Sequence, residues 1–383
     1  MKIKDINLFF EKGINCKKGN QGEVLFIPSG AVFPEKIKED KCHKTFSTEN
    51  IPKDKLIRKN DILFNSGGVG TLGRVGFYNK DIWSGDAICD PFVFIIRNND
   101  IKLYSKYLFY YFQTDQVKRN IVKYTVGSTG ITSIRKKDIL NFSINLPEVE
   151  QQKKIAQILD IDDNLRQKRK EQLALLDDYL KSVFLEMFGD PVLNSKKWLI
   201  KKLNEVGNLD RGISKNRPRN ASELLGGPYP LIQTGDVANS DYYIKEFKNT
   251  YSKLGLLQSR MWPIGTLCIT IAANIAKTGI LTFEACFPDS VVGFKPNNLV
   301  RTEYVQWWMF FLQKILEEKA PESAQKNINL GILRSLDIPV PPVELQNKFL
   351  SIIEQVEKTK QKMRDSLSEM DNHFNALMQR YFE

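Results

Sequence analysis

A long internal repeat is the feature that most constrains the fold of this chain. When the sequence is shifted by 194 residues, Ile144–Phe188 aligns with Ile338–Phe382 without a gap, and twelve of the 45 aligned positions are identical. A repeat at a fixed spacing indicates that one structural unit occurs more than once. Both copies carry apolar residues at alternating intervals of three and four, which is the seam of a coiled coil. The sequence therefore predicts two equivalent long helices.

The ends of both helices are marked in the sequence. Each helix begins just after proline, at Pro147 or Pro342, and neither contains a later proline that would break it. The first helix ends at Gly189, where glycine followed by Pro191 is typical of a helix C-terminus. The seam residues of the first copy, with their partners in the second, are expected in the core between the helices: Ile155, Leu159, Leu173, Leu176 and Leu180.

The segments ahead of the two helices share a common order of predicted elements. Short apolar runs rich in Val, Ile and Phe alternate with Gly, Asn and Asp turns, which predicts strands mixed with a few helices. Each segment has about 150 residues, enough to bury its own core. We therefore predict an α+β chain, with two similar α/β domains separated by a pair of long antiparallel coiled-coil helices. The predicted divisions are 1–146, 147–190, 191–340 and 341–383.

Charge and composition narrow the class of partner. The chain has 56 Lys and Arg against 45 Asp and Glu, a net charge of +11, which favours nucleic acid as partner, with an acidic membrane surface second. The longest apolar runs are too short to span a bilayer. Five scattered cysteines and two histidines form no metal-site spacing, so we expect free thiols in a reducing compartment, a cytoplasmic location and no bound metal.

Several local strings resemble the specificity subunit of type I restriction-modification enzymes. They are PVPPVELQ at 339–346, SAQKNI at 323–328, LIQTGDV at 231–237 and AANIAKTG at 272–279. The resemblance covers nearly the whole chain and includes the order of globule, long helix, globule, long helix. It implies that residues 1–146 and 191–340 are target-recognition domains.

The resemblance also implies a function for each part. Each target-recognition domain would read one half of a split, asymmetric site in double-stranded DNA. The two helices would hold the domains apart and dock two methyltransferase subunits, which restriction subunits join to form the nuclease. The chain itself would perform no chemistry and bind no cofactor.

Candidate DNA contacts are polar or basic residues in loops, because base edges are read by side chains that donate and accept hydrogen bonds and phosphates by cations. In the second half the candidates are Gln233, Thr234, Asn274, Lys277, Ser323, Gln325, Lys326 and Asn327, with Arg211, Lys215, Arg217 and Arg219 as a basic turn for phosphates. In the first half they are Ser29, Ser66, Arg74, Ser128, Thr129, Arg135, Lys136 and Lys137. Exposed apolar side chains near Phe184, Phe188 and Phe382 are the expected docking points for methyltransferase subunits.

Two other interpretations explain less of the sequence. A methyltransferase needs an Asn/Asp-Pro-Pro-aromatic loop, but Cys89–Phe92 has a single proline, and the glycine-rich stretch Asn65–Gly70 lacks the G-x-G-x-x-G pattern. No phosphate-binding lysine motif or nuclease-like cluster of carboxylates and lysine is visible either. A coiled-coil scaffold would account for the helices but not for the duplicated globules.

Overall fold

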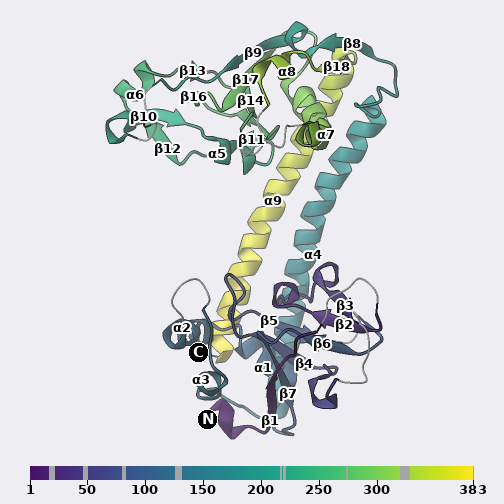
Figure 1. The fold of residues 1–383 in the computed structure, drawn as a ribbon, viewed down its shortest axis with the longest axis vertical. Helices are drawn as coiled ribbons and strands as arrows, with labels where there is room; N and C mark the ends of the chain where they lie inside the picture. Colours follow the sequence, from purple (N-terminus) through teal and green to yellow (C-terminus); the bar gives the residue numbers. More distant parts are fainter. Residues whose placement is uncertain are drawn as a thin grey trace. The chain divides into compact units, whose positions relative to one another are not determined.

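The computed structural model describes residues 1–16, 22–45, 51–79, 83–125, 132–215, 218, 221–272, 275–319 and 328–382 (Figure 1). These residues fall into two compact units. Unit 1 consists of Met1–Leu173 and Met363–Glu383, and unit 2 consists of Ala174–Lys362. Each unit therefore includes part of both long helices. The division of the chain into 1–146, 147–190, 191–340 and 341–383 remains a prediction.

Unit 1 contains two sheets. The larger is antiparallel, with the order β1 (Leu8–Lys12), β7 (Val93–Asn98), β4 (Asp61–Asn65), β5 (Val75–Tyr78). The smaller has the order β3 (His43–Thr45), β2 (Val24–Ile27), β6 (Ala87–Cys89), and its β2–β6 pair is parallel. All residues of β2 and β4 are buried. Both strands are therefore covered on their two faces, as their nearly continuous apolar sequences indicate.

Three α-helices complete the globular part of unit 1. They are α1 (Ser105–Tyr111), α2 (Asp115–Tyr124) and α3 (Lys136–Leu140). The short 3-10 helices are η1 (Ile3–Asp5), η2 (Ser29–Ala31), η3 (Glu39–Lys41) and η4 (Lys53–Lys55). Every side chain from Tyr107 to Tyr111 is buried, so α1 lies inside the core of the unit. Helix α2 begins at Thr114, whose hydroxyl accepts a hydrogen bond from the Val117 N–H at 3.3 Å, as an N-cap should.

Unit 2 repeats this arrangement with more strands. Its main sheet has the order β11 (Tyr243–Ile244), β15 (Thr278–Leu281), β14 (Leu267–Thr270), β17 (Val291–Pro296), β9 (Gly207–Arg211). A second sheet has the order β12 (Asn249–Tyr251), β10 (Leu225–Leu231), β16 (Ala285–Cys286), β13 (Met261–Trp262), and a third pairs β18 (Asp337–Val340) with β8 (Leu199–Lys202). In both units the main sheet ends in a strand that comes early in its part of the sequence, β1 or β9.

The helices of unit 2 surround an aromatic core. They are α5 (Thr234–Ala238), α6 (Lys253–Leu257), α7 (Thr302–Lys319) and α8 (Leu330–Arg334), with the 3-10 helices η5 (Leu203–Glu205) and η6 (Ser222–Leu224). Helix α7 buries Tyr304, Trp307 and Trp308. Aromatic side chains bury large apolar areas, so this helix contributes strongly to the core.

The two predicted long helices are present as α4 (Val149–Phe188) and α9 (Val343–Phe382), each of 40 residues. Of the seam residues expected in the core, Ile155, Leu159 and Leu180 are buried, and Leu173 and Leu176 are half-buried. The apolar periodicity therefore identified the inward face of α4, although its middle is the least covered part.

Polar contacts show the direction of the helices in unit 1. Asp162 of α4 meets His373 of α9 at 2.9 Å, whereas Arg166, one turn further along α4, meets Asp371 at 2.7 Å, before His373 in α9. The two helix segments of unit 1 therefore run antiparallel.

The same direction holds in unit 2. Asp177 of α4 meets Lys360 of α9 at 2.8 Å, and Phe184, further along α4, contacts Phe349, earlier in α9, with ring centroids 5.5 Å apart. Lys360, whose side chain is 2 % exposed, is thus paired with Asp177 between the antiparallel helices.

A buried glutamine fixes the start of each long helix to its own unit. Its side-chain amide donates to two backbone carbonyls, and its side-chain oxygen accepts from one N–H. For Gln152 the carbonyls belong to Lys102 and Pro147 and the N–H to Tyr104, at 2.7, 2.7 and 2.8 Å. For Gln346 the carbonyls belong to Leu299 and Pro341, at 3.0 and 2.9 Å, and the N–H to Arg301, at 2.7 Å. These identical contacts explain why glutamine stands at the same position in both repeats.

Candidate nucleic-acid interface

Nine of the predicted DNA-contact residues lie outside the described residues: Ser128, Thr129, Arg217, Arg219, Asn274, Ser323, Gln325, Lys326 and Asn327. Their roles stay predictions. The residues that follow two of these segments are described, and they are attached in the same way. The Ile134 N–H donates to the Ser66 carbonyl at 2.8 Å, and the Ile328 N–H donates to the Ile271 carbonyl at 3.0 Å. In both units a residue beyond the predicted loop is therefore bonded to the residue that follows a central strand of the main sheet.

Two predicted phosphate contacts of unit 2 lie at the edge of its main sheet. Arg211 is the last residue of β9 and is exposed. Lys215 is exposed as well, and its backbone N–H donates to the Gln258 side-chain oxygen at 2.6 Å. The buried Gln258 holds the backbone, which leaves the Lys215 ammonium on the surface.

The other described candidates of unit 2 lie near α5 and at the start of β15. Gln233 is exposed at the N-cap of α5, and its N–H donates to Asp236 at 2.8 Å, while Thr234 is half-buried. Lys277 is exposed, and its ammonium donates to the Gln313 side-chain oxygen at 3.3 Å. All three side chains have at least part of their surface open to solvent.

In unit 1 the two predicted serines that the structure describes, Ser29 and Ser66, have different surroundings. Ser66 is buried, with 3 % of its surface exposed, and its hydroxyl donates to the Phe92 carbonyl at 2.8 Å. Ser29 is half-buried, and its carbonyl accepts from the Asn65 side chain at 2.9 Å. Because the hydroxyl of Ser66 is inside and already bonded, we leave this residue out of the proposed interface.

The basic candidates of unit 1 are held by internal contacts. The Arg74 guanidinium lies over the Phe33 ring at 4.6 Å and donates to the Gly70 carbonyl. Among the basic run beside α3, Arg135 is exposed and pairs with Asp138 at 2.8 Å. Lys136 pairs with Glu11 at 2.9 Å, and Lys137 is exposed. The contacts of Arg74, Arg135 and Lys136 orient these three cations without covering them.

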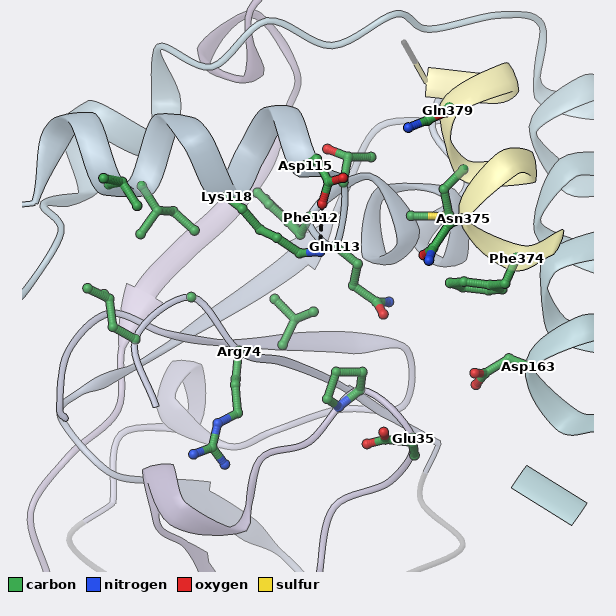
Figure 2. A pocket seen from close by; sticks show the side chains of 18 of the residues that line it. Glu35, Arg74, Phe112, Gln113, Asp115, Lys118, Asp163, Phe374, Asn375 and Gln379 are labelled. Carbon is green, nitrogen blue, oxygen red and sulfur yellow. Dashed lines mark hydrogen bonds and ion pairs between the residues drawn. The ribbon is translucent and has the colours of Figure 1, made fainter. Parts of the chain in front are cut away.

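Arg74 lines a cleft of about 570 Å³ in unit 1 (Figure 2). Gln113 and Lys118 come from the α1–α2 region, and Phe374 and Gln379 come from α9. A smaller cleft of about 310 Å³ in unit 2 is lined by Lys277, Asp177 and Trp307. Both clefts therefore combine a basic residue from the turn after a central strand, β4 in unit 1 or β14 in unit 2, with residues of a long helix.

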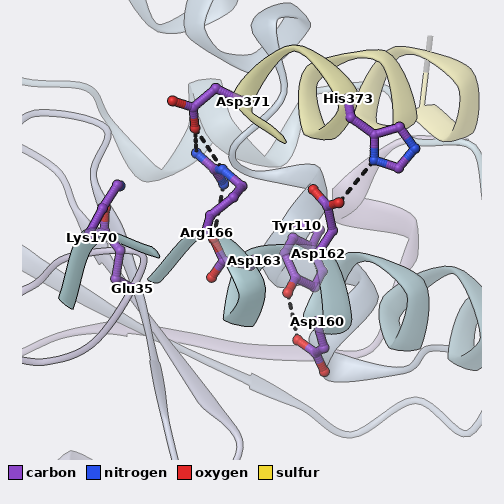
Figure 3. A network of polar contacts seen from close by, with 9 residues as sticks. All are labelled: Glu35, Tyr110, Asp160, Asp162, Asp163, Arg166, Lys170, Asp371 and His373. Atoms are coloured by element: carbon purple, nitrogen blue, oxygen red, sulfur yellow. Dashed lines mark hydrogen bonds and ion pairs between the residues drawn. The ribbon is translucent and has the colours of Figure 1, made fainter. Parts of the chain in front are cut away.

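A polar network joins the helices inside unit 1 (Figure 3). Arg166 pairs with Asp371 at 2.7 Å and with Asp163 at 3.0 Å. The Tyr110 hydroxyl donates to Asp160 at 2.5 Å. Burial raises the pKa of the Asp163 carboxyl and, together with the Asp160 carboxylate, the pKa of the Tyr110 hydroxyl. The network therefore places charges where the apolar seam is interrupted.

Unit 2 has an equivalent charged triad at equivalent repeat positions, joined by a tyrosine from a different position. Lys360 pairs with Asp177 at 2.8 Å and with Glu357 at 3.0 Å, and its side chain is only 2 % exposed. The Tyr242 hydroxyl donates to Asp177 at 3.1 Å, and burial and that carboxylate raise the pKa of Tyr242. A shift of 194 residues superimposes Lys360, Asp177 and Glu357 on Arg166, Asp371 and Asp163.

The expectation of exposed aromatic docking points on the long helices is wrong for the three named phenylalanines. Phe184, Phe188 and Phe382 are buried, with 0 %, 2 % and 8 % of their surface exposed. Phe188 contacts Tyr304 at 4.9 Å between ring centroids, and Phe382 contacts Tyr107 at 4.7 Å. These aromatic residues close the core of each unit, because the helical seam continues into the globular part.

The exposed apolar side chains of the long helices are all on α4. Ile158, Ile161 and Leu165 belong to unit 1, and Leu175, Tyr179 and Leu185 belong to unit 2, each between 41 % and 65 % exposed. Helix α9, which is described over its whole length, has no large apolar side chain in this exposure class. The repeated helices thus share an inner seam but differ on their outer faces.

The described part of the chain offers neither a metal site nor a membrane span. No three His, Cys, Asp or Glu residues of these ranges are grouped so that they could hold a metal ion. Each helix in the same ranges lacks the length or the hydrophobicity needed to cross a membrane.

The sequence matches a known family in two places. The model for the type I restriction modification DNA specificity domain matches residues 17–175 and 195–369. The two matches together cover most of the chain, and each spans one globular segment and the first part of the long helix that follows it. The alternation of domain and long helix is thus shared with this family.

Full-length relatives agree with the family match. A Methanocaldococcus jannaschii protein named as the type I restriction enzyme MjaX specificity subunit is 25 % identical over 340 residues, which are 83 % of this chain and 77 % of that protein. The Escherichia coli type I restriction enzyme EcoBI specificity subunit is 19 % identical over 374 residues, or 88 % and 76 % of the two chains.

Solved structures share the fold. The S subunit of a type I restriction-modification system from M. genitalium matches with a TM-score of 0.59 at 15 % identity, covering 100 % of this chain and 95 % of that one. A chain from a structure of the type I restriction-modification system, solved to explain complex assembly and conformational transition, matches with a TM-score of 0.57 at 16 % identity over 98 % and 97 %. The predicted α+β fold class is confirmed, and the chain belongs to the type I restriction modification DNA specificity domain family.

Proposed function

We propose that this chain is the DNA-recognition subunit of a type I restriction-modification system and reads a split, asymmetric site. The observation that carries this proposal is the double match of one DNA specificity domain to the two repeats. Two copies of a recognition domain fit two half-sites, as the two-fold symmetry of dimeric repressors fits their operators. Because residues 1–146 and 191–340 differ in sequence, the two half-sites should differ.

The two units support different recognition chemistry at corresponding positions. Unit 1 presents Arg74 beside its cleft, whereas unit 2 presents Lys277. Arginine forms a planar fork that can contact guanine with two hydrogen bonds, whereas lysine is a flexible single charge. A difference of this kind changes how a base or phosphate can be contacted at that position, and it supports two unlike half-sites.

Methyltransferase and restriction subunits are the proposed partners. The chain supplies sequence recognition, and the partners supply catalysis and its cofactors. The exposed apolar side chains of α4 replace the buried phenylalanines as proposed docking points, since apolar surface at a helix face is stabilised when a partner helix covers it. We propose two methyltransferase subunits per chain, one for each unit, and action on DNA in the cytoplasm.

The test is methylation of a DNA library randomised over both half-sites, using the full chain with its methyltransferase subunits. We expect one split motif with an unread spacer. Replacing residues 1–146 by the first domain of another subunit should change one half of the motif only. An unsplit motif, or loss of both halves after this exchange, would contradict the proposal.

A second experiment examines the predicted recognition loop of residues 191–340. Gln325→Ala and Asn327→Ala should each relax one half-site by about 1–3 kcal/mol if the side chain makes a bidentate base contact. Arg217→Ala should instead weaken binding to all sequences about equally and lower the salt slope by roughly one. A full motif in both loop variants would show that the loop does not read bases.

A further inference from the structure

A cluster of charged side chains lies on the edge strand of the main sheet in each unit. The edge strands are β1 and β9, and the fourth residue of each is acidic, Glu11 or Asp210. A basic residue follows at once, Lys12 or Arg211. The acidic residue is held by two further cations from distant parts of the same unit. We name these groups the edge cluster of unit 1, Glu11 with Lys55 and Lys136, and the edge cluster of unit 2, Asp210 with Arg260 and Arg334.

The two clusters are built from corresponding segments. In unit 1 the Lys136 ammonium is 2.9 Å and the Lys55 ammonium 3.7 Å from the Glu11 carboxylate. Lys55 also donates to the Lys12 carbonyl at 3.1 Å. One cation thus comes from the segment ahead of β4, and the other from the short helix α3 ahead of the long helix α4.

In unit 2 the same two segments supply arginines. Arg260, ahead of β14, lies 3.5 Å from Asp210, and Arg334, at the end of the short helix α8 ahead of α9, lies 3.4 Å from it. Arg334 also donates to the Leu209 carbonyl at 2.8 Å, and Arg260 lies over the Trp262 ring at 4.1 Å. The identities of all three residues differ from those of unit 1, but their charges and places do not.

Stability does not explain why this pattern occurs twice. The side chains are between 20 % and 51 % exposed, and exposed ion pairs contribute about 0–1 kcal/mol at most. Each cluster has one negative and two positive charges, so it remains cationic after its internal pairing. The carboxylate and the aromatic or carbonyl contacts hold the cations in place, which lowers the entropy lost when they bind an anion.

We propose that the edge clusters bind the phosphate backbone of DNA, one cluster in each unit. This inference rests on the proposed function, and it adds Lys55, Arg260 and Arg334 to the predicted contacts, which already include Lys136. Lys136 and Arg334 belong to the short helices that follow the predicted recognition loops, so the cations are attached close to those loops along the chain. Phosphate contacts position a protein on the duplex without reading its sequence. Each cluster would therefore orient its unit while the loops select the bases.

Salt-dependent DNA binding by the full-length chain tests this proposal. Each phosphate contact contributes roughly 0.9 to the slope of log affinity against log salt. On a short random-sequence duplex, the double variants Lys55→Gln/Lys136→Gln and Arg260→Gln/Arg334→Gln should each lower the slope by about two. Lys153→Gln and Lys202→Gln are matched controls, because both remove an exposed lysine that pairs with an acidic residue outside the clusters. The controls should retain the slope of the unchanged chain.

Replacing the acidic residue of each edge cluster should change DNA affinity in the opposite direction. Glu11→Gln and Asp210→Asn remove the charge that competes with phosphate, so both should strengthen binding to the random duplex, while thermal unfolding shows that the variants remain folded. A purely structural role predicts no gain in affinity. Wild-type slopes in both double variants, or loss of partner-subunit binding with unchanged DNA binding, would overturn the proposal. If the unchanged chain with its partners shows no sequence preference, the proposed function itself fails.

Discussion

The two units use the same charged triad between their long helices but enclose it to different extents. In unit 1 Arg166 is 16 % exposed between Asp163 and Asp371, whereas in unit 2 Lys360 is 2 % exposed between Glu357 and Asp177. Arginine is more weakly hydrated than lysine, but the lysine is the one that is buried. The repeat therefore preserves the sign of each charge. The rest of each unit determines how deeply the central cation is buried, and hence how much stability is lost when its partners are removed.

An ion pair of unit 1 is replaced in unit 2 by two residues of like charge. In unit 1 Lys106 pairs with Asp160 at 3.1 Å. Lys106 precedes Tyr107, which donates to the Asn145 carbonyl, and Glu303 precedes Tyr304, which donates to the Pro339 carbonyl, so the two positions correspond. In unit 2 Glu303 and Glu354 are thus two like charges, and burial and then Glu354 raise the pKa of Glu303. The same site is therefore attractive in unit 1 and repulsive in unit 2.

Removing a buried aromatic side chain should produce the largest loss of stability, and one that differs between the two units. Phe184 is fully buried against Tyr304, Phe311 and Phe349, whereas its repeat equivalent Met378 is 7 % exposed. Phe184→Ala should cost about 4 kcal/mol and Met378→Ala about 2 kcal/mol, because the larger side chain leaves the larger cavity. Denaturant unfolding of the full chain measures both. A larger loss for Met378→Ala than for Phe184→Ala would contradict the expected order.

The buried lysine should show the next largest effect. Lys360→Met leaves Asp177 and Glu357 without their cation and should destabilise unit 2 by about 3 kcal/mol, as the loss of one partner of a buried ion pair does. Arg166→Met should cost about 1 kcal/mol, because Arg166 is 16 % and its second partner Asp163 26 % exposed, against 2 % for Lys360 and 13 % for Glu357. Lys153→Met, on the solvent side of α4, is the control. Equal losses from the two triads would show that their difference in burial has no energetic consequence.

Restoring complementarity in unit 2 should give a smaller gain. Glu303→Lys places a cation beside Glu354, as Lys106 stands beside Asp160, and should stabilise the protein by up to about 1 kcal/mol. Lys106→Glu should have the reverse effect in unit 1. Thermal unfolding measures whether Glu303→Lys raises stability and Lys106→Glu lowers it. A loss of stability in Glu303→Lys would contradict the equivalence of the two sites.

The smallest expected effect is a pH dependence of folding stability that comes from Glu303. Its pKa is raised in the folded protein, so the folded state retains this proton at a pH where the unfolded chain has released it. Stability from Glu303 is therefore present below the ordinary pKa of 4.5 and is lost as pH rises through the raised value. The stability of the unchanged chain relative to Glu303→Gln should fall with pH in that window. A constant difference between the two proteins would disprove the shift.

The helices and the duplication could be predicted from the sequence, whereas much of the candidate site could not. A seam of period three and four is local information, and Gln152 and Gln346 share a position because each makes the same contacts at a helix start. The burial of Phe184, Phe188 and Phe382 was missed, since an apolar residue at a helix end can face a partner or its own globule. Only the packing of α1 and α7 distinguishes these outcomes.

The sequence by itself determined that one unit occurs twice, with long helices, an excess of positive charge and a family resemblance in short motifs. Only the tertiary structure decided which charges meet. Glu11 and Lys136 are 125 positions apart, as are Leu209 and Arg334, and Arg166 and Asp371 are 205 positions apart. Periodicity reports the face of a single element, but a contact between distant residues depends on how several elements pack. The physical reason is that side-chain pairing is set by distances in space, which local sequence patterns do not contain.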